Sequence, residues 1–430
     1  MTVLAQRLTA PPDEAEARAR LLLIRIPSAI MAVLEALDRA GFHGVVVGGA
    51  VRDALLGEAG GDWDVATNAT PDEVIALFPK TIPTGIEHGT VTVLSGHGDE
   101  RHSIELTTFR GEGVYHDGRR PSEVRFLREL KEDLARRDLT INAFAWDPVN
   151  QVFTDAFGGL ADLRAGLIRA VGDPATRFAE DGLRTMRAVR FAATMGFRLA
   201  PETRAAIAGA LDVFDKVSRE RVRVELVKLL SAGRPSLGLI PMADTGLWDR
   251  VLVPLAEPAR SEAIAAVDRL AAQPMLRLAR LLWPVRFERT TLEAMLEQLK
   301  PSREERATIL RLTDALVDEL REAAGLTDPS AGPCVRRIVA ELGRPYLDDA
   351  LALLELDAPS LARVHAALDG AALHTKELAI KGRDLIEAKV AGPGKQLGEL
   401  LDALLDWVLE DPARNHPDQL VAEARARLPL

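Results

Sequence analysis

The chain of 430 residues has a single cysteine, Cys334. A lone cysteine excludes an internal disulfide, and no neighbouring Cys or His stands at metal-ligand spacing, so we expect a buried or idle thiol. Long apolar runs are also missing, since none approaches the roughly 20 residues of a membrane-spanning helix. The first residues, with Asp13, Glu14 and Glu16, lack the cationic and apolar regions of a signal peptide. These absences predict a cytoplasmic protein with no membrane partner.

Positive charge is scarce over the chain as a whole. There are 54 lysines and arginines against 64 aspartates and glutamates, which gives a formal net charge of −10. Net charge governs solubility, whereas nucleic-acid binding depends on local patches, so the acidic total does not exclude RNA binding. The chain exceeds the size of a single core, and its composition of 47% hydrophobic and 27% charged residues is typical of several globular domains.

The pattern of apolar residues changes near residue 175. Beyond that point apolar residues recur every three to four positions and strand patterns nearly vanish, so we expect only helices there. Before it, short β-branched runs alternate with helical stretches and glycine-rich turns, which predicts a domain of strands and helices. The expected fold class is therefore α+β. The runs that we assign to strands are 45–47, 90–94, 103–109 and 168–171.

Two helices can be placed by their sequence. We expect an N-terminal helix over 13–40. A second helix start is marked by Thr70, Pro71 and Glu73, which form an N-cap, a first-turn proline and a capping-box glutamate.

A glycine pair follows the apolar run 45–47. Gly48 and Gly49 stand between that expected strand and a helix, and Arg52 follows three residues later. In a strand, glycine turn and helix of this order, exposed amide groups and Arg52 face an anion such as a phosphate. A tight turn without a ligand is the alternative.

Three acidic residues suit a metal site. Asp62 and Asp64 are two apart in the next strand pattern, so both carboxylates point from one face, and Glu105 in the run 103–109 offers a third acid. Hard oxygen ligands suit Mg²⁺ beside a triphosphate. Two Mg²⁺ ions held by these acids would suit nucleotidyl transfer, with one metal activating a hydroxyl and the other stabilising the leaving pyrophosphate. A solvated surface pair and an exposed edge-strand glutamate are the alternatives.

Further polar residues cluster at 137–142, just before an apolar stretch. Arg137 could meet phosphates, Asp138 could accept a hydrogen bond from a ribose hydroxyl, and Asn142 stands beside them. A helix cap with a local ion pair is the alternative interpretation.

An acid and three arginines recur at every third residue further along: Asp181, Arg184, Arg187 and Arg190. On a helix they would form a band along one side, for which a solvated face is the usual explanation. A sharper explanation is base selection. Cytosine and adenine each present an amino donor beside a ring-nitrogen acceptor, whereas guanine and uracil present a carbonyl beside a ring N–H. A carboxylate next to a guanidinium, such as Asp181 with Arg184, matches only the first pattern.

Five stretches of the chain carry a family resemblance. They read Gly-Gly-Ala-Val-Arg-Asp (48–53), Asp-Trp-Asp (62–64), Arg-Arg-Asp-Leu-Thr-Ile-Asn-Ala (136–143), Glu-Asp-Gly-Leu-Arg-Thr-Met-Arg-Ala-Val-Arg-Phe (180–191) and Ser-Arg-Glu-Arg-Val-Arg-Val-Glu (218–225). In this order they resemble the motifs of class II tRNA nucleotidyltransferases, the CCA-adding enzymes, over roughly residues 40–235. Bacterial poly(A) polymerases share much of the set.

The resemblance implies a fold and an activity. It implies a polymerase-β-like head (1–172), a helical neck with the base-selecting motif (173–235), a helical body (236–355) and a helical tail that binds tRNA (356–430). The implied activity is template-independent addition of CCA to the tRNA 3′ end from CTP and ATP, with two metal ions, release of pyrophosphate and no obligate protein partner. RNA contacts are expected along arginines of the neck and of the helices beyond it, including Arg219, Arg221 and Arg223.

The resemblance also assigns site residues. It gives Asp62 and Asp64 to the metal, whereas Glu105 matches only by context. Gly182 is a departure, because many relatives have proline there, and we expect glycine to loosen the helix start. To the incoming nucleotide the resemblance gives Gly49, Arg52, Arg137, Asp181, Arg184, Arg187 and Arg190.

Three alternatives remain. Poly(A) synthesis is disfavoured because 83–90 lacks the basic segment associated with those polymerases. An enzyme that adds only CC is disfavoured because the expected mobile loop 111–121 keeps its Asp-Gly-Arg-Arg-Pro sequence, which favours a retained switch from CTP to ATP. A non-catalytic RNA-binding protein is disfavoured because the metal acids and the base-selecting pair are both present.

Overall fold

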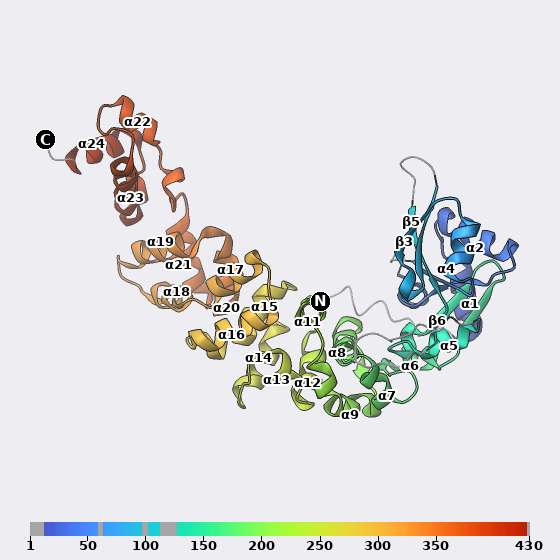
Figure 1. The fold of residues 1–430 in the computed structure, drawn as a ribbon. Coiled ribbons are helices and arrows are strands. Elements are labelled where there is room, and N and C mark those ends of the chain that lie inside the picture. Colours follow the sequence, from blue (N-terminus) through green and yellow to red (C-terminus); the bar gives the residue numbers. More distant parts are fainter. Residues whose placement is uncertain (1–12, 59–62, 97–101, 112–125, 127, 428–430) are drawn as a thin grey trace. The chain divides into compact units, whose positions relative to one another are not determined.

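The computed structural model describes residues 13–58, 63–96, 102–111, 126 and 128–427 (Figure 1). The chain divides into two compact units, Met1–Pro254 and Leu255–Leu430. Every strand of the described chain lies in the first unit, and the second is helical, so the α+β class is confirmed. Within the described residues no helix has both the length and the apolar character that crossing a membrane requires. The finer boundaries at 172, 235 and 355 stay predictions.

A mixed sheet of seven strands forms the centre of the first part of the chain, in blue to teal in Figure 1. Its order is β3-β4-β5-β2-β1-β6-β7, and only β2 and β5 run parallel. The strands are β1 (Gly44–Val47), β2 (Asp64–Thr67), β3 (Thr81–Gly85), β4 (Thr90–Ser95), β5 (His102–Thr108), β6 (Phe144–Asp147) and β7 (Val152–Asp155).

Burial explains which strands can be recognised in the sequence. All four residues of β1 are buried, as are those of β6, which fits strands covered on both faces. The runs 45–47, 90–94 and 103–109 fall on β1, β4 and β5 as expected. The run 168–171 forms only the short β8 (Leu167–Ile168), which pairs in parallel with β9 (Arg198–Leu199). β9 lies beyond residue 175, so the expectation of helices alone in that part of the chain is wrong for these two residues.

Helices surround the sheet and continue beyond it. The expected helix over 13–40 is divided into two, because Pro27 offers no amide hydrogen and stands as the N-cap of the second. The capping box of Thr70 and Glu73 is present at the start of α4. The helices of the sheet-bearing part are α1 (Glu14–Leu22), α2 (Ser28–Arg39), α3 (Gly49–Leu55), α4 (Pro71–Leu77), α5 (Leu130–Ala135) and α6 (Gly159–Ala165).

The rest of the first unit is built around one buried helix, α8 (Leu183–Met195). Gly238 and Gly182 allow close contacts with it. A Cβ on Gly238 would lie 2.5 Å from the carbonyl oxygen of Val189 in α8, and a Cβ on Gly182, just before α8, would lie 2.5 Å from the backbone of Phe214. The other helices here are α7 (Pro174–Glu180), α9 (Pro201–Gly209), α10 (Leu211–Phe214), α11 (Arg219–Leu230), α12 (Ser236–Asp244) and α13 (Leu247–Val251).

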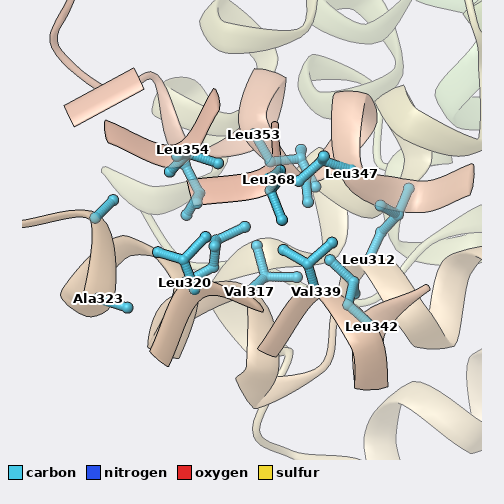
Figure 2. Packing of buried hydrophobic residues seen from close by; sticks show 14 of the residues in the cluster. Leu312, Val317, Leu320, Ala323, Val339, Leu342, Leu347, Leu353, Leu354 and Leu368 are labelled. Carbon is cyan, nitrogen blue, oxygen red and sulfur yellow. The ribbon is translucent and has the colours of Figure 1, made fainter. Parts of the chain in front are cut away.

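The second unit has its own hydrophobic core. Figure 2 shows leucines, valines and an alanine from α17 to α21 pointing toward one another, and Val317 and Leu320 at its centre are fully buried. Cys334 is a free, partly buried thiol packed against this core. The helices are α14 (Ala259–Val267), α15 (Pro274–Leu282), α16 (Arg289–Leu299), α17 (Arg303–Leu312), α18 (Ala315–Gly325), α19 (Ala331–Leu342), α20 (Leu347–Leu354), α21 (Ala358–Leu368), α22 (Gly382–Glu387), α23 (Lys395–Glu410) and α24 (Pro417–Arg427).

Candidate nucleotide-binding site

A polar cavity of about 430 Å³ lies in the first unit, between the sheet and helices α8 and α11. Its volume is within the usual range for a small-molecule site. Six arginines and four aspartates are among its lining residues, so positive charge is in excess, as a polyanionic ligand requires. Six residues singled out from the sequence line the cavity: Asp64, Arg137, Asp138, Asp181, Arg184 and Arg187.

Gly48 opens the space beside Asp64. Its φ of 76° lies in the left-handed region that favours glycine. A Cβ on Gly48 would also lie 2.9 Å from Nη1 of Arg137 and 4.0 Å from Oδ2 of Asp64. Glycine at this position therefore keeps a carboxylate and a guanidinium accessible from the same side of the strand end.

The expected third acid lies on the neighbouring strand. Leu106 pairs with Val65, so Glu105 stands beside Asp64 along the parallel pair β2 and β5. Glu105 is exposed and is not among the cavity's lining residues. Among the described residues no group of three or more potential metal ligands is close enough to hold an ion, and Asp62 lies outside them. The metal-ligand set stays a prediction.

Arg52 has a different place from the one expected. Its side chain is buried, pairs with Asp53 and donates a hydrogen bond to Oδ1 of Asn142. A Cβ on Gly49 would lie 3.6 Å from Nη2 of Arg52, an ordinary van der Waals distance, so this contact does not itself require glycine. Arg52 does not line the cavity and is linked to the lining residue Asp138 through Asn142.

Asp138 is the next link of the same network. Oδ1 accepts hydrogen bonds from Nδ2 of Asn142 and from the amide of Leu139, and Oδ2 accepts one from Nε of Arg187, whose Nη2 lies 2.6 Å away. Both oxygens of the carboxylate are therefore engaged. Burial opposes ionisation, but the charge of Arg187 and these hydrogen bonds outweigh it, so the pKa of Asp138 lies below its ordinary value. A ribose hydroxyl could bind Asp138 only by sharing or displacing one of these bonds.

Three of the expected cations gather around one aromatic ring, that of Phe191. The guanidinium of Arg190 lies 3.5 Å from the ring centroid, and those of Arg52 and Arg187 lie 5.1 and 5.6 Å away. Arg190 also pairs with Glu225 of α11 at 2.8 Å. Arg190 therefore stands behind the cavity, and Phe191 joins residues of α3 to residues of α8.

Asp181 does not belong to the helical band that the sequence suggests. It stands between α7 and α8, where Oδ1 accepts the amide of Leu183 at 3.0 Å and so caps the first turn of α8. Its carboxylate pairs with Arg221 of α11. Arg184 and Arg187 do share α8 and both line the cavity.

Arg184 is held by its neighbours rather than by Asp181. Its Nη1 pairs with Glu180 and donates to the carbonyl of Arg177, and its Nη2 donates to the carbonyl of Arg136. These bonds use three of its five N–H groups, so two remain for a ligand.

Arg137 also has an unused hydrogen-bond donor. Its Nε is buried and finds no hydrogen-bond partner in the described part of the chain. Its guanidinium makes two long contacts, one of 3.4 Å from Nη2 to the buried Asp133 and one of 3.5 Å from Nη1 to the carbonyl of Asn142. Burial opposes ionisation of Asp133, but the charges of Arg136 and Arg137 outweigh it, so its pKa is lowered and it stays a carboxylate at neutral pH.

The sequence interpretation missed several residues that hold the site together. Glu180, Glu225, Asp133 and Phe191 contact the expected residues, and Arg221 lines the cavity although it was expected to meet RNA. Four of the five lie inside the resembling stretches 180–191 and 218–225, which was the available signal. The expected loop at 111–121 lies outside the described residues, apart from Gly111.

Family models match three parts of the chain. The "Poly A polymerase head domain" matches residues 45–169, and the "Probable RNA and SrmB- binding site of polymerase A" matches residues 196–259. A model of tRNA nucleotidyltransferase domain 2 matches residues 359–424.

Similar proteins extend over almost the whole chain. The CCA-adding enzyme of Lactiplantibacillus plantarum is 37% identical and covers 94% of this chain and 98% of its own. That of Levilactobacillus brevis is 38% identical over 91% of this chain and 95% of its own.

Solved structures are similar as well. The Bacillus stearothermophilus CCA-adding enzyme in complex with CTP matches with a TM-score of 0.68 and 31% identity, over 93% of this chain and 96% of the other. The Thermotoga maritima CCA-adding enzyme complexed with tRNA matches with a TM-score of 0.71 over 96% and 98%, and at 21% identity that likeness concerns the fold alone.

Proposed function

The chain belongs to the CCA-adding enzyme family of nucleotidyltransferases, and on this basis we propose that it adds C, C and A to the 3′ end of tRNA. The substrates would be CTP and ATP, and the by-product pyrophosphate. The observation that carries the proposal is the meeting of Asp64, Asp181 and Arg184 at one cavity with an excess of arginine. Asp64 lies at the end of the sheet, whereas the other two come from the start of α8.

The hydrogen-bonding positions of Asp181 and Arg184 that other contacts leave unused support the choice of C and A. Leu183 and Arg221 use three acceptor positions of Asp181, which leaves one on Oδ2. Arg184 keeps two N–H donors. One acceptor beside donors fits the amino group and ring nitrogen of cytosine or adenine and opposes the carbonyl and N–H of uracil or guanine.

The triphosphate would be held by the arginines of the cavity. Arg137 has a buried Nε with a free donor, and Arg187 lines the cavity beside it. Arg187 is fixed by Asp138, whose charge raises the pKa of Arg187, so the guanidinium stays charged. Asp138, Asn142 and Arg52 would act by holding these groups, together with Gly48, Gly49 and Arg190.

A divalent metal ion at Asp64 is part of the proposal. Asp64 offers hard carboxylate oxygens at the cavity, and Gly48 leaves the space beside them open. Asp62 and Asp64 would hold the ion, in our proposal one of two Mg²⁺ ions, and Glu105 stands on the adjacent strand. When bound, the metal would supply positive charge to the phosphates and would increase the acidity of the attacking hydroxyl.

Sizing the products nucleotide by nucleotide tests this function. We expect tRNA that lacks its 3′ CCA to gain two residues with CTP alone and three with CTP and ATP. Growth that stops at CC in the presence of ATP would favour a CC-only enzyme, and long A tracts would favour a poly(A) polymerase.

Asp64→Ala should lower incorporation by about 100-fold or more, because it removes a carboxylate that would hold the metal ion and, with the ion, the positive charge at the transferred phosphate. tRNA binding, measured by filter retention, should be preserved. The exposed Asp72→Ala is the matched control. Full incorporation by the Asp64 variant would contradict the proposal.

A further inference from the structure

Arg221 makes a two-point contact with Asp181. Nη2 of Arg221 lies 2.7 Å from Oδ2 of Asp181, and Nη1 lies 3.4 Å from Oδ1. The two residues are 40 positions apart, Arg221 in the first turn of α11 and Asp181 just before α8. Both line the cavity, and the side chain of Asp181 is 19% exposed, so their contact is partly protected from water.

Little else holds the Asp181 carboxylate. Asp181 lies outside regular helix, with φ of −147°, and its carboxylate also accepts the amide of Leu183. Arg187 is near enough for its pKa to be raised by the charge of Asp181. Without Arg221, the carboxylate would be free to rotate toward the other guanidinium groups of the cavity, and its remaining acceptor would no longer face a fixed direction.

The same helix also holds the next part of the cavity. Glu225, one turn after Arg221, pairs with Arg190 at 2.8 Å and contacts Arg187 at 3.8 Å. Thus two side chains of α11 form ion pairs with this part of the chain. Arg221 pairs with Asp181, just before α8, and Glu225 pairs with Arg187 and Arg190 of α8.

We propose that Arg221 is a positioning residue that sets nucleobase specificity by fixing the carboxylate of Asp181. The proposal rests on the proposed function, in which Asp181 accepts the amino group of C or A. A fixed, ionised carboxylate presents one acceptor in one direction, and this repels the carbonyl of uracil or guanine. A carboxylate that can rotate would accept the correct base less well and reject the wrong base less strongly.

Arg221→Gln tests the proposal through a ratio of rates. The values of kcat/KM would be measured for CTP and UTP on tRNA lacking CCA, and for ATP and GTP on tRNA ending in CC. We expect the preference for C over U and for A over G to fall by about tenfold or more, mainly through KM for the correct nucleotide. Arg204→Gln, which breaks a surface pair with Asp244 between α9 and α12, should leave the preference unchanged.

A purely structural role would lower all four rates together and leave the preference intact, and that result would overturn the proposal. If the Gln variant does not fold, Arg221→Lys takes its place. Lysine keeps a cation but loses the two-point contact, so the Lys variant should show an intermediate preference. In a double-mutant cycle, Arg221→Gln should add nothing to the loss of preference caused by Asp181→Ala. Additive losses would mean that Arg221 acts by another route.

Nucleotide binding in the absence of tRNA separates this proposal from the proposed function. If the unaltered protein extends no tRNA, the function fails. The ratio of CTP to UTP affinity, measured by calorimetry on the unaltered chain and on Arg221→Gln, would still show whether Arg221 sets base preference. An unchanged affinity ratio would overturn the role of Arg221 alone.

Discussion

At the scale of single residues, Asp138 joins the loop after α5 to α8. Its pKa lies below the ordinary value, so its ion pair with Arg187 contributes stability that is fully present above the unfolded pKa of about 3.9 and is lost as pH falls through the folded value. We expect Asp138→Asn to lower the free energy of unfolding by about 3 kcal/mol at pH 7. The deficit should stay constant above about pH 5 and should shrink as pH falls below the unfolded value of about 3.9. Urea unfolding at several pH values measures it.

The surface pair of Asp244 and Arg204 provides the control, since Asp244→Asn should cost about 1 kcal/mol at most. A deficit in Asp138→Asn that stays constant down to pH 3 would mean that the buried carboxylate is not the titrating group.

Residue identities could be predicted from the sequence better than residue contacts. The types at 64, 137, 181, 184 and 187 identified the cavity, because the chemistry of a triphosphate and a base edge demands those groups. The partners could not be read in the same way. Arg52 meets Asn142 across 90 positions and Arg187 meets Asp138 across 49, and such contacts depend on how elements pack rather than on local pattern.

At the scale of elements, Gly182 governs how α8 meets α10. Its φ of −56° is ordinary for any residue, so the expected looseness at the helix start is not what requires glycine. A Cβ would lie 2.5 Å from the backbone nitrogen of Phe214. We expect Gly182→Ala to lower the free energy of unfolding by about 1 to 3 kcal/mol, because backbone must shift. Thermal unfolding followed by circular dichroism measures this.

Gly209, the last residue of α9, is the matched control because a Cβ there would meet nothing within 4 Å. Gly209→Ala should leave stability unchanged or raise it by about 0.5 to 1 kcal/mol. Equal losses in both variants would show that the contact with Phe214 is not the cause.

Elements with a local signal were predictable, and elements without one were not. The capping box of α4 needs only residues three apart, so Thr70 and Glu73 revealed it. The edge strands β3 and β7 are mostly exposed or half-buried, so they carry no alternation of apolar residues to read. β6 reads Phe-Ala-Trp-Asp and is buried throughout, and periodicity cannot tell so short a run from part of a helix.

At the scale of the whole molecule, the two units have separate cores and the cavity belongs to the first. A ligand stabilises only the part that binds it, by about 2.7 kcal/mol at 100 times its Kd. We therefore expect two calorimetric transitions, and CTP should raise the midpoint temperature of only one of them. A single transition that CTP shifts as a whole would contradict this.

Core variants assign the two transitions. Leu320→Ala removes a fully buried side chain from the core of the second unit. It should lower the free energy of unfolding of that unit by about 2 to 5 kcal/mol, and so lower the temperature of the transition that CTP leaves unchanged. Gly182→Ala should lower the other transition.

The order of charge on α11 has a consequence for redesign. Arg221 and Glu225 read positive then negative, opposite Asp181 and Arg187, which read negative then positive. Each charge on α11 thus faces an opposite charge at the start of α8. A protein engineered to choose U and G would need a donor in place of the Asp181 carboxylate, and Arg221 would have to change with it, since a cation at position 181 would contact the like charge of Arg221.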